Sequence, residues 1–245
     1  DCNNPSIPSV PVLMRFNNLG DTLFTKWFPY TGTYPGGTNM VYDIGNTLFE
    51  NSDHGYSFIY NRIESGGTSA TLNSFRLMRT DSLGNQIWDY AYNIAGGVRS
   101  IIKLNGGSCL VYGETTLIKI NDQGFVQWTQ TIPNPVQTQL RSIIQTTNGF
   151  LATGINCHPT TGSGPCNTAV IEFDNLGNQI NSQYFGNQIQ DNDDHLVSMI
   201  TDLSNGNFAI TGTIDREFIV TTTMSQLYSK LFVLNSDFSG DVIGC

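Results

Sequence analysis

The residues best suited to chemistry in this sequence are an acidic cluster, five cysteines and scattered aromatic side chains. The acidic cluster consists of Asp191, Asp193 and Asp194 in the segment QDNDDHL. Several carboxylate oxygens on one loop suit a hard cation such as calcium. The alternative is a solvated loop that connects two strands and holds no metal. We favour the solvated loop, and we expect no other cofactor.

The cysteines favour disulfides over zinc, because no CxxC pair and no suitably spaced histidine accompanies them. Cys157 and Cys166 flank the Pro- and Gly-rich segment HPTTGSGP, so we expect a disulfide that closes this loop. The alternative is two free thiols in a reducing compartment. Cys2 and Cys245 lie at the two ends of the sequence, and a ring-shaped fold would allow a disulfide between them. Cys109, in the apolar run CLVYG, is predicted to be a buried thiol.

Aromatic side chains are the other candidate binding groups. Trp27, Trp88, Trp128 and Phe24 fall in the outer strands of predicted hairpins, where we expect them to pack between repeats. Tyrosines that we expect to be exposed, in or beside predicted loops, are better candidates for stacking on a sugar ring. These ligand-binding candidates are Tyr30, Tyr34, Tyr56 and Tyr228.

Motifs for catalysis are missing from the sequence, which contains no HExxH, no GxSxG and no glycine-rich phosphate loop. We therefore assign no catalytic residue. The remaining enzyme hypothesis is a glycoside hydrolase, because two carboxylates are enough for that reaction. The carboxylates in or near predicted strands are Glu50, Glu114, Glu172 and Asp202.

Charge and hydropathy exclude two classes of partner. The formal net charge of -9 and the isoelectric point near 4.5 argue against nucleic acid, which binds clustered Lys and Arg. The apolar stretches are as long as strands and shorter than the roughly 20 residues of a membrane-spanning helix. No charged-then-apolar leader begins the sequence. We therefore expect a mature, soluble chain.

One unit recurs five times along the chain: an apolar strand, a tight turn with glycine, and a second strand. The turn glycines are Gly20, Gly84, Gly124, Gly177 and Gly240. Three residues before each glycine stands Asn17, Asp81, Asn121, Asp174 or Asp237. An Asx side chain accepts a hydrogen bond from the backbone two residues on, and glycine tolerates the positive φ of a tight hairpin. Each copy is therefore predicted to be a β-hairpin.

A second strand–turn–strand unit lies between these hairpins, and the two units together make a four-stranded antiparallel meander. Such meanders are the blades of a β-propeller. We predict an all-β fold with about five blades in one domain, 1–245. The predicted parts are a hairpin at 12–30 and blades at about 40–92, 99–132, 141–186 and 197–245. The first blade is either incomplete or completed by the N-terminal segment CNNPSIPSVPV. Alternatively, other sequence or a second molecule completes the ring.

The length of the repeats varies because of insertions that we expect to be loops. Loops on one face of a repeat array are where binding tends to occur. The insertions are TYPGGTNMVYD, SGGTSATLN, HPTTGSGPCN and DREFIVTTTMSQLYS.

Two segments, LMRTDSLGNQIWDYAY and SIIQTTNGFLATG, resemble the β-propeller repeats of secreted and cell-surface proteins of the Bacteroidota. The resemblance covers nearly the whole chain. It implies export by the type nine secretion system and a role in adhesion, gliding or surface assembly. Two features depart from the pattern: no sorting domain follows Cys245, and Asn181 stands where other copies have Trp88 and Trp128.

The same resemblance extends to two short tripeptides, Asp-Thr-Leu and Asp-Ser-Leu, which are similar to an O-glycosylation acceptor of those bacteria. It implies modification of Thr22 and Ser82. The alternative is an unmodified surface turn at each position.

The leading functional hypothesis is an extracellular or cell-surface module without enzymatic activity, which binds a glycan or a surface protein. The first alternative is a glycoside hydrolase. The second is a structural subunit of a surface fibre or secretion-linked assembly, in which the chain forms oligomers.

Overall fold

The computed structural model describes residues 10–29, 41–66, 70–92, 98–113, 115–132, 138–157, 166–185, 194–203, 207–221 and 224–236. Every helix or strand in this part of the chain is a β-strand, so the all-β prediction is confirmed. Across these ranges no helix is long and apolar enough to cross a membrane.

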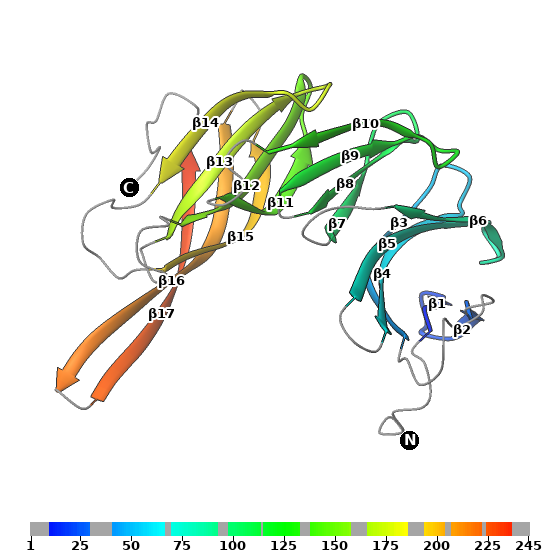
Figure 1. Ribbon diagram of the computed structural model, residues 1–245, viewed down its shortest axis with the longest axis horizontal. Coiled ribbons are helices and arrows are strands. Elements are labelled where there is room, and N and C mark those ends of the chain that lie inside the picture. Colours follow the sequence, from blue (N-terminus) through cyan, green and yellow to red (C-terminus); the bar gives the residue numbers. More distant parts are fainter. Residues whose placement is uncertain are drawn as a thin grey trace. The chain divides into compact units, whose positions relative to one another are not determined.

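The strands form five sheets that follow one another along the chain (Figure 1). The first sheet contains β1 (Val12–Phe16) and β2 (Thr22–Trp27). The second contains β3 (Val41–Glu50), β4 (Tyr56–Gly66), β5 (Ala70–Thr80) and β6 (Gln86–Tyr92). The third contains β7 (Val98–Lys103), β8 (Cys109–Gly113), β9 (Thr116–Ile120) and β10 (Val126–Thr131). The fourth contains β11 (Thr138–Gln145), β12 (Gly149–Cys157), β13 (Cys166–Asp174) and β14 (Gln179–Phe185). The fifth contains β15 (Asp194–Leu203), β16 (Asn207–Thr221) and β17 (Met224–Ser236).

Each sheet is an antiparallel meander, because neighbours in the sheet are also neighbours in sequence. The chain divides into two compact units, one of residues 1–113 and 119–127 and one of residues 114–118 and 128–245. The boundary falls within the third sheet. The single domain proposed from the sequence stays a prediction.

The repeated hairpin turns have the geometry expected from their Asx and Gly residues. At the β5–β6 turn, Asp81 Oδ1 accepts hydrogen bonds from the backbone N–H of Leu83 at 2.9 Å and of Asn85 at 2.8 Å. Asn17, Asn121 and Asp174 accept the equivalent bonds at the other described turns. The four turn glycines have φ between 75° and 87°. The predicted turn at Asp237 and Gly240 lies outside the described residues.

Successive sheets pack through equivalent positions of these hairpins. In the first unit, Leu13 of the first sheet packs with Tyr56, Phe58 and Met78 of the second. In the second unit, Val170 of the fourth sheet packs with Phe208 and Ile210 of the fifth. Leu13 and Val170 both stand four residues before the Asx residue of their turn. One face of each hairpin therefore packs on the next sheet.

The outer strand of each hairpin places a bulky side chain against the turn glycine of the next sheet. A Cβ added to Gly84 would lie 2.8 Å from the ring of Phe24, and one added to Gly177 would lie 2.7 Å from the ring of Trp128. A Cβ added to Gly124 would likewise lie 2.5 Å from the ring of Tyr90. Phe24 and Trp128 both stand four residues after the glycine of their own turn. Glycine is therefore needed for close approach as well as for positive φ.

The predicted packing of aromatic residues between repeats is confirmed for Phe24 and Trp128. Phe24 makes an edge contact with Tyr56, with ring centroids 6.3 Å apart, and Trp128 makes one with Phe150 at 6.1 Å. Trp88 stacks instead on Tyr90 of its own strand, at 5.2 Å. The expectation is wrong for Trp27, whose side chain is exposed. Trp27 lies on the opposite face of β2 from Phe24, because side chains alternate along a strand.

Two of the predicted insertion loops are instead extensions of strands. The segment DREFIVTTTMSQLYS lies almost wholly in β16 and β17, which continue as the long two-stranded ribbon at the lower left of Figure 1. Most of SGGTSATLN belongs to the ends of β4 and β5. The first of these segments is rich in β-branched and aromatic residues, which favour strands.

Replacing Gly84 by Ala is expected to destabilise the protein more than replacing Gly20 by Ala. Both glycines have positive φ, so each substitution carries a strain of about 1–2 kcal/mol. Only the Ala at position 84 also meets the Phe24 ring, since nothing lies within 4 Å of a Cβ at Gly20. That overpacking adds about 1–3 kcal/mol. Urea denaturation of both variants measures the difference, and equal losses would contradict the contact.

Replacing Asp81 and Asp174 together by Asn is expected to make folding less sensitive to acid. Hydrogen bonds from Asn85 and Asn178 hold the pKa values of these carboxyls below the ordinary value of 3.8. A carboxyl whose pKa is lower in the folded state stabilises it above the unfolded pKa, and this stabilisation is lost as pH falls through the folded pKa. Asn keeps the acceptor oxygen, as Asn17 and Asn121 show at the other turns.

Urea denaturation at about pH 6 and about pH 3 tests this prediction. The wild type should lose more stability than the double variant over that interval. A double variant that unfolds at both pH values would show that the negative charge itself, and not the acceptor oxygen, holds the turns.

Candidate binding surface

The acidic cluster, for which we expect a solvated loop rather than a calcium site, lies mostly outside the described residues. Asp191 and Asp193 are outside them, and Asp194 is the first residue of β15. Within the ranges that the structure describes, no group of three or more His, Cys, Asp or Glu side chains could hold a metal ion. The solvated loop at Asp191, Asp193 and Asp194 stays a prediction, with a calcium site as its alternative.

The register of β12 and β13 places Cys157 directly opposite Cys166. Directly opposite residues of an antiparallel pair have Cα atoms about 4.5–5.5 Å apart, which lies within the range of a disulfide. The backbone is therefore compatible with the predicted bond, which itself stays a prediction. Cys2 and Cys245 lie outside the described residues. Cys109 is buried as predicted, and burial raises the pKa of its thiol to about 12.

The tyrosines predicted to bind sugar have different environments. Tyr56 is buried against Leu13 and Phe24, so the expectation that its ring is exposed is wrong. It begins β4 with its side chain on the face that packs against the first sheet. Tyr30 and Tyr34 lie outside the described residues, and Tyr228 is a residue of β17.

The two positions predicted to carry O-glycans lie at hairpin turns. Thr22 is exposed at the start of β2. Ser82 lies in the β5–β6 turn, where its carbonyl oxygen accepts a hydrogen bond from Arg15 Nη1 at 3.4 Å. Both glycosylation sites stay predictions.

The carboxylates considered for glycoside hydrolysis lie on three different sheets where they are described. Glu50 ends β3, Glu172 lies in β13 and Asp202 lies in β15, while Glu114 is outside the described residues. The Glu50 carboxylate contacts His54 Nδ1 at 2.7 Å in the exposed turn after β3.

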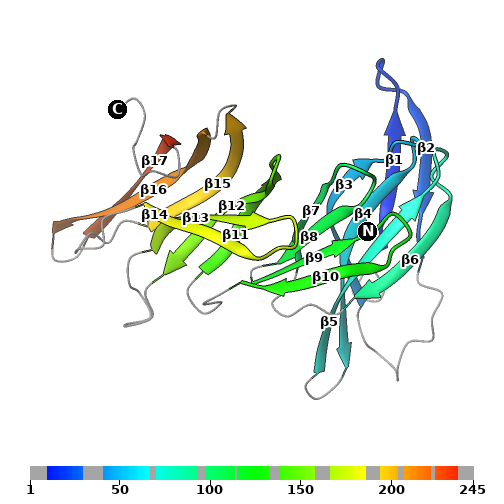
Figure 2. The ribbon, with the colours of Figure 1, turned by 90° about the horizontal axis from the view of Figure 1, so that it is seen from above.

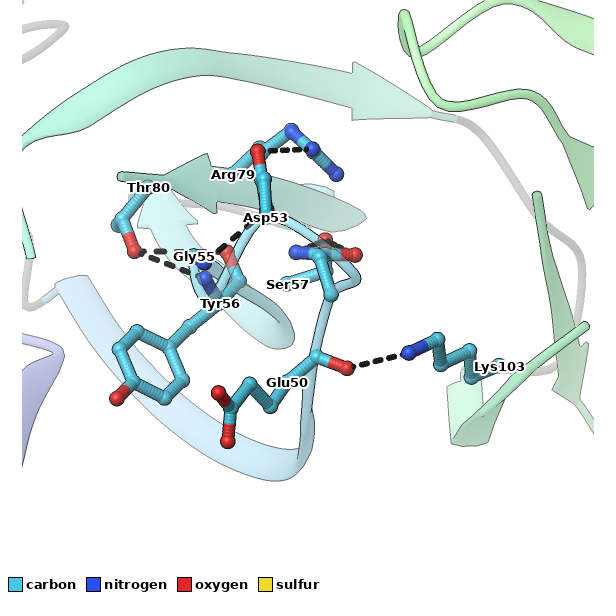
Figure 3. Close-up of polar contacts among 9 residues, drawn as sticks. Glu50, Asp53, Gly55, Tyr56, Ser57, Arg79, Thr80 and Lys103 are labelled. Atoms are coloured by element: carbon cyan, nitrogen blue, oxygen red, sulfur yellow. Dashed lines mark hydrogen bonds and ion pairs between the residues drawn. The ribbon is translucent and has the colours of Figure 1, made fainter. Parts of the chain in front are cut away.

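Polar side chains around that turn hold the backbone (Figure 3). Asp53 Oδ1 accepts a hydrogen bond from the Gly55 N–H at 3.0 Å, and Asp53 Oδ2 accepts one from Arg79 Nη2 at 2.8 Å. These contacts lower the pKa of Asp53, with the Gly55 N–H as the largest cause. Lys103 Nζ donates to the carbonyl oxygen of Glu50 at 2.8 Å, and the Glu50 side chain points away from it in Figure 3. These side chains fix the turn.

A partly buried ion pair on the second sheet is absent from the sequence predictions. Arg76 Nη2 lies 3.0 Å from Asp89 Oδ2, and the same oxygen accepts a hydrogen bond from the Tyr60 hydroxyl at 2.8 Å. Arg76 Nε donates in turn to the Tyr60 hydroxyl at 3.0 Å. The only sequence signal is an arginine inside an apolar strand. A buried charge of this kind is paired because an unpaired one would be costly.

The described hairpins share a set of exposed apolar side chains, which we call the turn row. In three hairpins a Leu in the turn is followed four residues later by Leu or Ile. In the third sheet the exposed apolar residues are instead Phe125 and Val126, which directly follow the turn glycine Gly124. The turn row consists of Leu19, Leu23, Leu83, Ile87, Phe125, Val126, Leu176 and Ile180, all of them exposed. Each described hairpin therefore exposes apolar side chains at its turn end.

Comparison with known proteins assigns no family. No family model and no curated protein matches the chain. Among solved structures, 22 chains match. One is a protein of unknown function from Bacteroides caccae, with 13% identity, a TM-score of 0.44, and coverage of 92% of this chain and 85% of that chain. Another is the complex of KlAtg21 with the coiled-coil of AgAtg16, with 11% identity, a TM-score of 0.39, and coverage of 77% and 71%.

Replacing Cys157 and Cys166 by Ser is expected to destabilise the oxidised protein. A disulfide between these strand ends closes a short loop, which is worth about 2–3 kcal/mol in the chain-entropy model. Non-reducing peptide mapping tests the bond, and thermal denaturation with and without reductant tests its effect. The double variant should match the reduced wild type. Detection of both thiols as free in protein purified under oxidising conditions would contradict the bond.

Proposed function

We propose that this chain is a β-propeller repeat protein that acts outside the cell as a non-enzymatic module for binding or surface assembly. Successive antiparallel meanders that pack through equivalent hairpin positions support the propeller fold. The cross-strand position of Cys157 and Cys166 supports an oxidising, extracellular location. The sequence resemblance to surface repeats of the Bacteroidota supports the same location.

The turn row is the observation that carries the proposed binding function. It repeats with the hairpins, so each of the two units offers similar apolar contacts. Several weak contacts made together give a binding strength above that of any single one. The aliphatic side chains in the row favour a protein surface as the ligand, because apolar patches bind by removing apolar area from water.

Two substitutions in the turn row, Leu83→Asp and Leu176→Asp, test the proposal when made together. Burying one leucine contributes about 1.5–3 kcal/mol, so binding should weaken about tenfold or more for each leucine in contact with the ligand. Binding of the labelled protein to an array of purified extracellular proteins and glycans provides the measurement. Wild-type protein should bind at least one protein on the array.

Gln123 offers a matched control, because it occupies in the third hairpin the position of Leu83 and Leu176. Gln123→Asp adds one negative charge, as each of the two leucine substitutions does, without removing an apolar side chain. Equal loss of binding in this control would refute the apolar contact.

Release of sugar from a polysaccharide panel, abolished by Glu50→Gln or Asp202→Asn, would favour a glycoside hydrolase instead.

A further inference from the structure

We propose that Asn105, in the turn between β7 and β8, is a site of spontaneous deamidation, at which a neutral amide becomes a carboxylate. The reaction takes place between the Asn105 side chain and the backbone nitrogen of Gly106, and water is the only other reactant. Neither residue belongs to the turn row, so this inference does not rest on the proposed function.

The sequence places a glycine directly after an asparagine at three positions, namely Asn105, Asn148 and Asn205. Glycine has no Cβ, so its backbone nitrogen is the least hindered one that a neighbouring side chain can meet. In an unfolded chain these three asparagines are therefore expected to react at similar rates. Asn205 lies outside the described residues, and the structure distinguishes between the other two.

The reaction begins when the Gly106 nitrogen, having lost its proton to water or hydroxide, attacks Cγ of Asn105. The N–Cγ bond forms, the Cγ–Nδ2 bond breaks, and the side-chain nitrogen takes a proton from water and leaves as ammonia. Water then opens the cyclic succinimide at either of its carbonyl carbons. One opening gives aspartate, and the other gives isoaspartate, in which the main chain runs through Cγ. Nothing is oxidised or reduced.

The β7–β8 turn leaves both reacting residues accessible. Figure 2 shows β7 and β8 side by side, and a hydrogen bond from the Leu104 N–H to the Ser108 carbonyl oxygen at 2.9 Å closes the turn between them. Asn105 and Gly106 lie within this turn, and both are exposed. Gly106 has a φ of 85°, and no described atom lies within 4 Å of a Cβ added there. Water and hydroxide can therefore reach the Gly106 nitrogen, which has room to approach Cγ.

The β11–β12 turn holds its asparagine and glycine more firmly. Gly149 is buried and, as the first residue of β12, pairs with the end of β13. Its carbonyl oxygen accepts a hydrogen bond from the Thr146 N–H at 3.0 Å, and the Phe173 carbonyl occupies the place of a Cβ. Among the described residues, no backbone hydrogen bond of this kind fixes Gly106. Attack by the Gly149 nitrogen on Asn148 would require the start of β12 to leave the sheet.

Deamidation at Asn105 changes both the charge and the length of the turn. Either product adds one negative charge to a chain whose formal net charge is -9. Isoaspartate also lengthens the main chain between β7 and β8. Leu104 and Cys109, on the two sides of this turn, are 3% and 4% exposed, so a longer turn must fit between buried ends. The isoaspartate form is therefore expected to be less stable than the aspartate form.

Peptide mapping by mass spectrometry, on the full chain incubated in mildly alkaline buffer, tests the proposal. Loss of the amide should be about tenfold faster at Asn105 than at Asn148, because Gly149 must first lose a hydrogen bond and its strand pairing. In protein unfolded by urea the two rates should become similar, since both sites have the same dipeptide. Labelling with an isoaspartyl methyltransferase should identify isoaspartate at position 105.

Two variants connect the product to the turn. Gly106→Ala should slow the reaction at Asn105 and leave the rate at Asn148 unchanged, because the added Cβ shields the attacking nitrogen. Asn105→Asp supplies the aspartate form, and aged protein rich in isoaspartate should unfold at a lower temperature than this variant. Equal rates at Asn105 and Asn148 in the folded protein would overturn the proposal. So would a rate at Asn105 that Gly106→Ala does not change.

Discussion

The close approach of an outer-strand side chain to the turn glycine of the next sheet is the contact on which the repeated architecture depends. Phe24 over Gly84 and Trp128 over Gly177 are the same contact made by different residues. Two requirements coincide at each glycine: the hairpin needs positive φ, and the neighbouring ring leaves no room for a Cβ. Glycine therefore meets both the backbone requirement of the hairpin turn and the close packing of that turn against the preceding sheet.

The polar side chains of the described hairpins act mainly on their own backbone. Asp81 and Asp174 accept hydrogen bonds that close their turns, and Asp53 joins a turn to Arg79 on β5. Carboxylates engaged in this way have lowered pKa values, so they remain ionised and accept hydrogen bonds at neutral pH. The carboxylates of Asp53, Asp81 and Asp174 therefore stabilise the turns in which they lie.

The local features of the fold were predictable from the sequence, and those that depend on neighbours were not. The turns at Asn17 and Asp81 were predicted correctly, because an Asx acceptor and a glycine with positive φ act within a few residues. The burial of Tyr56 was missed, because it requires knowing which face of β4 meets the first sheet. The pair of Arg76 and Asp89 depends on the register of β5 and β6, which the sequence does not show directly.

Exposed apolar residues arise in two ways in this repeat architecture: some recur in every described hairpin, and others are exposed in one sheet and buried in the next. The turn row recurs because every described hairpin exposes apolar side chains in or shortly after its turn. Leu48 on β3 is exposed, whereas Ile101 and Ile143, at its position in the next two sheets, are buried. Leu48 and Ile101 have the same position and similar chemistry, and only their neighbours differ. Burial at one position of a repeat therefore depends on the neighbouring sheet as well as on the residue itself.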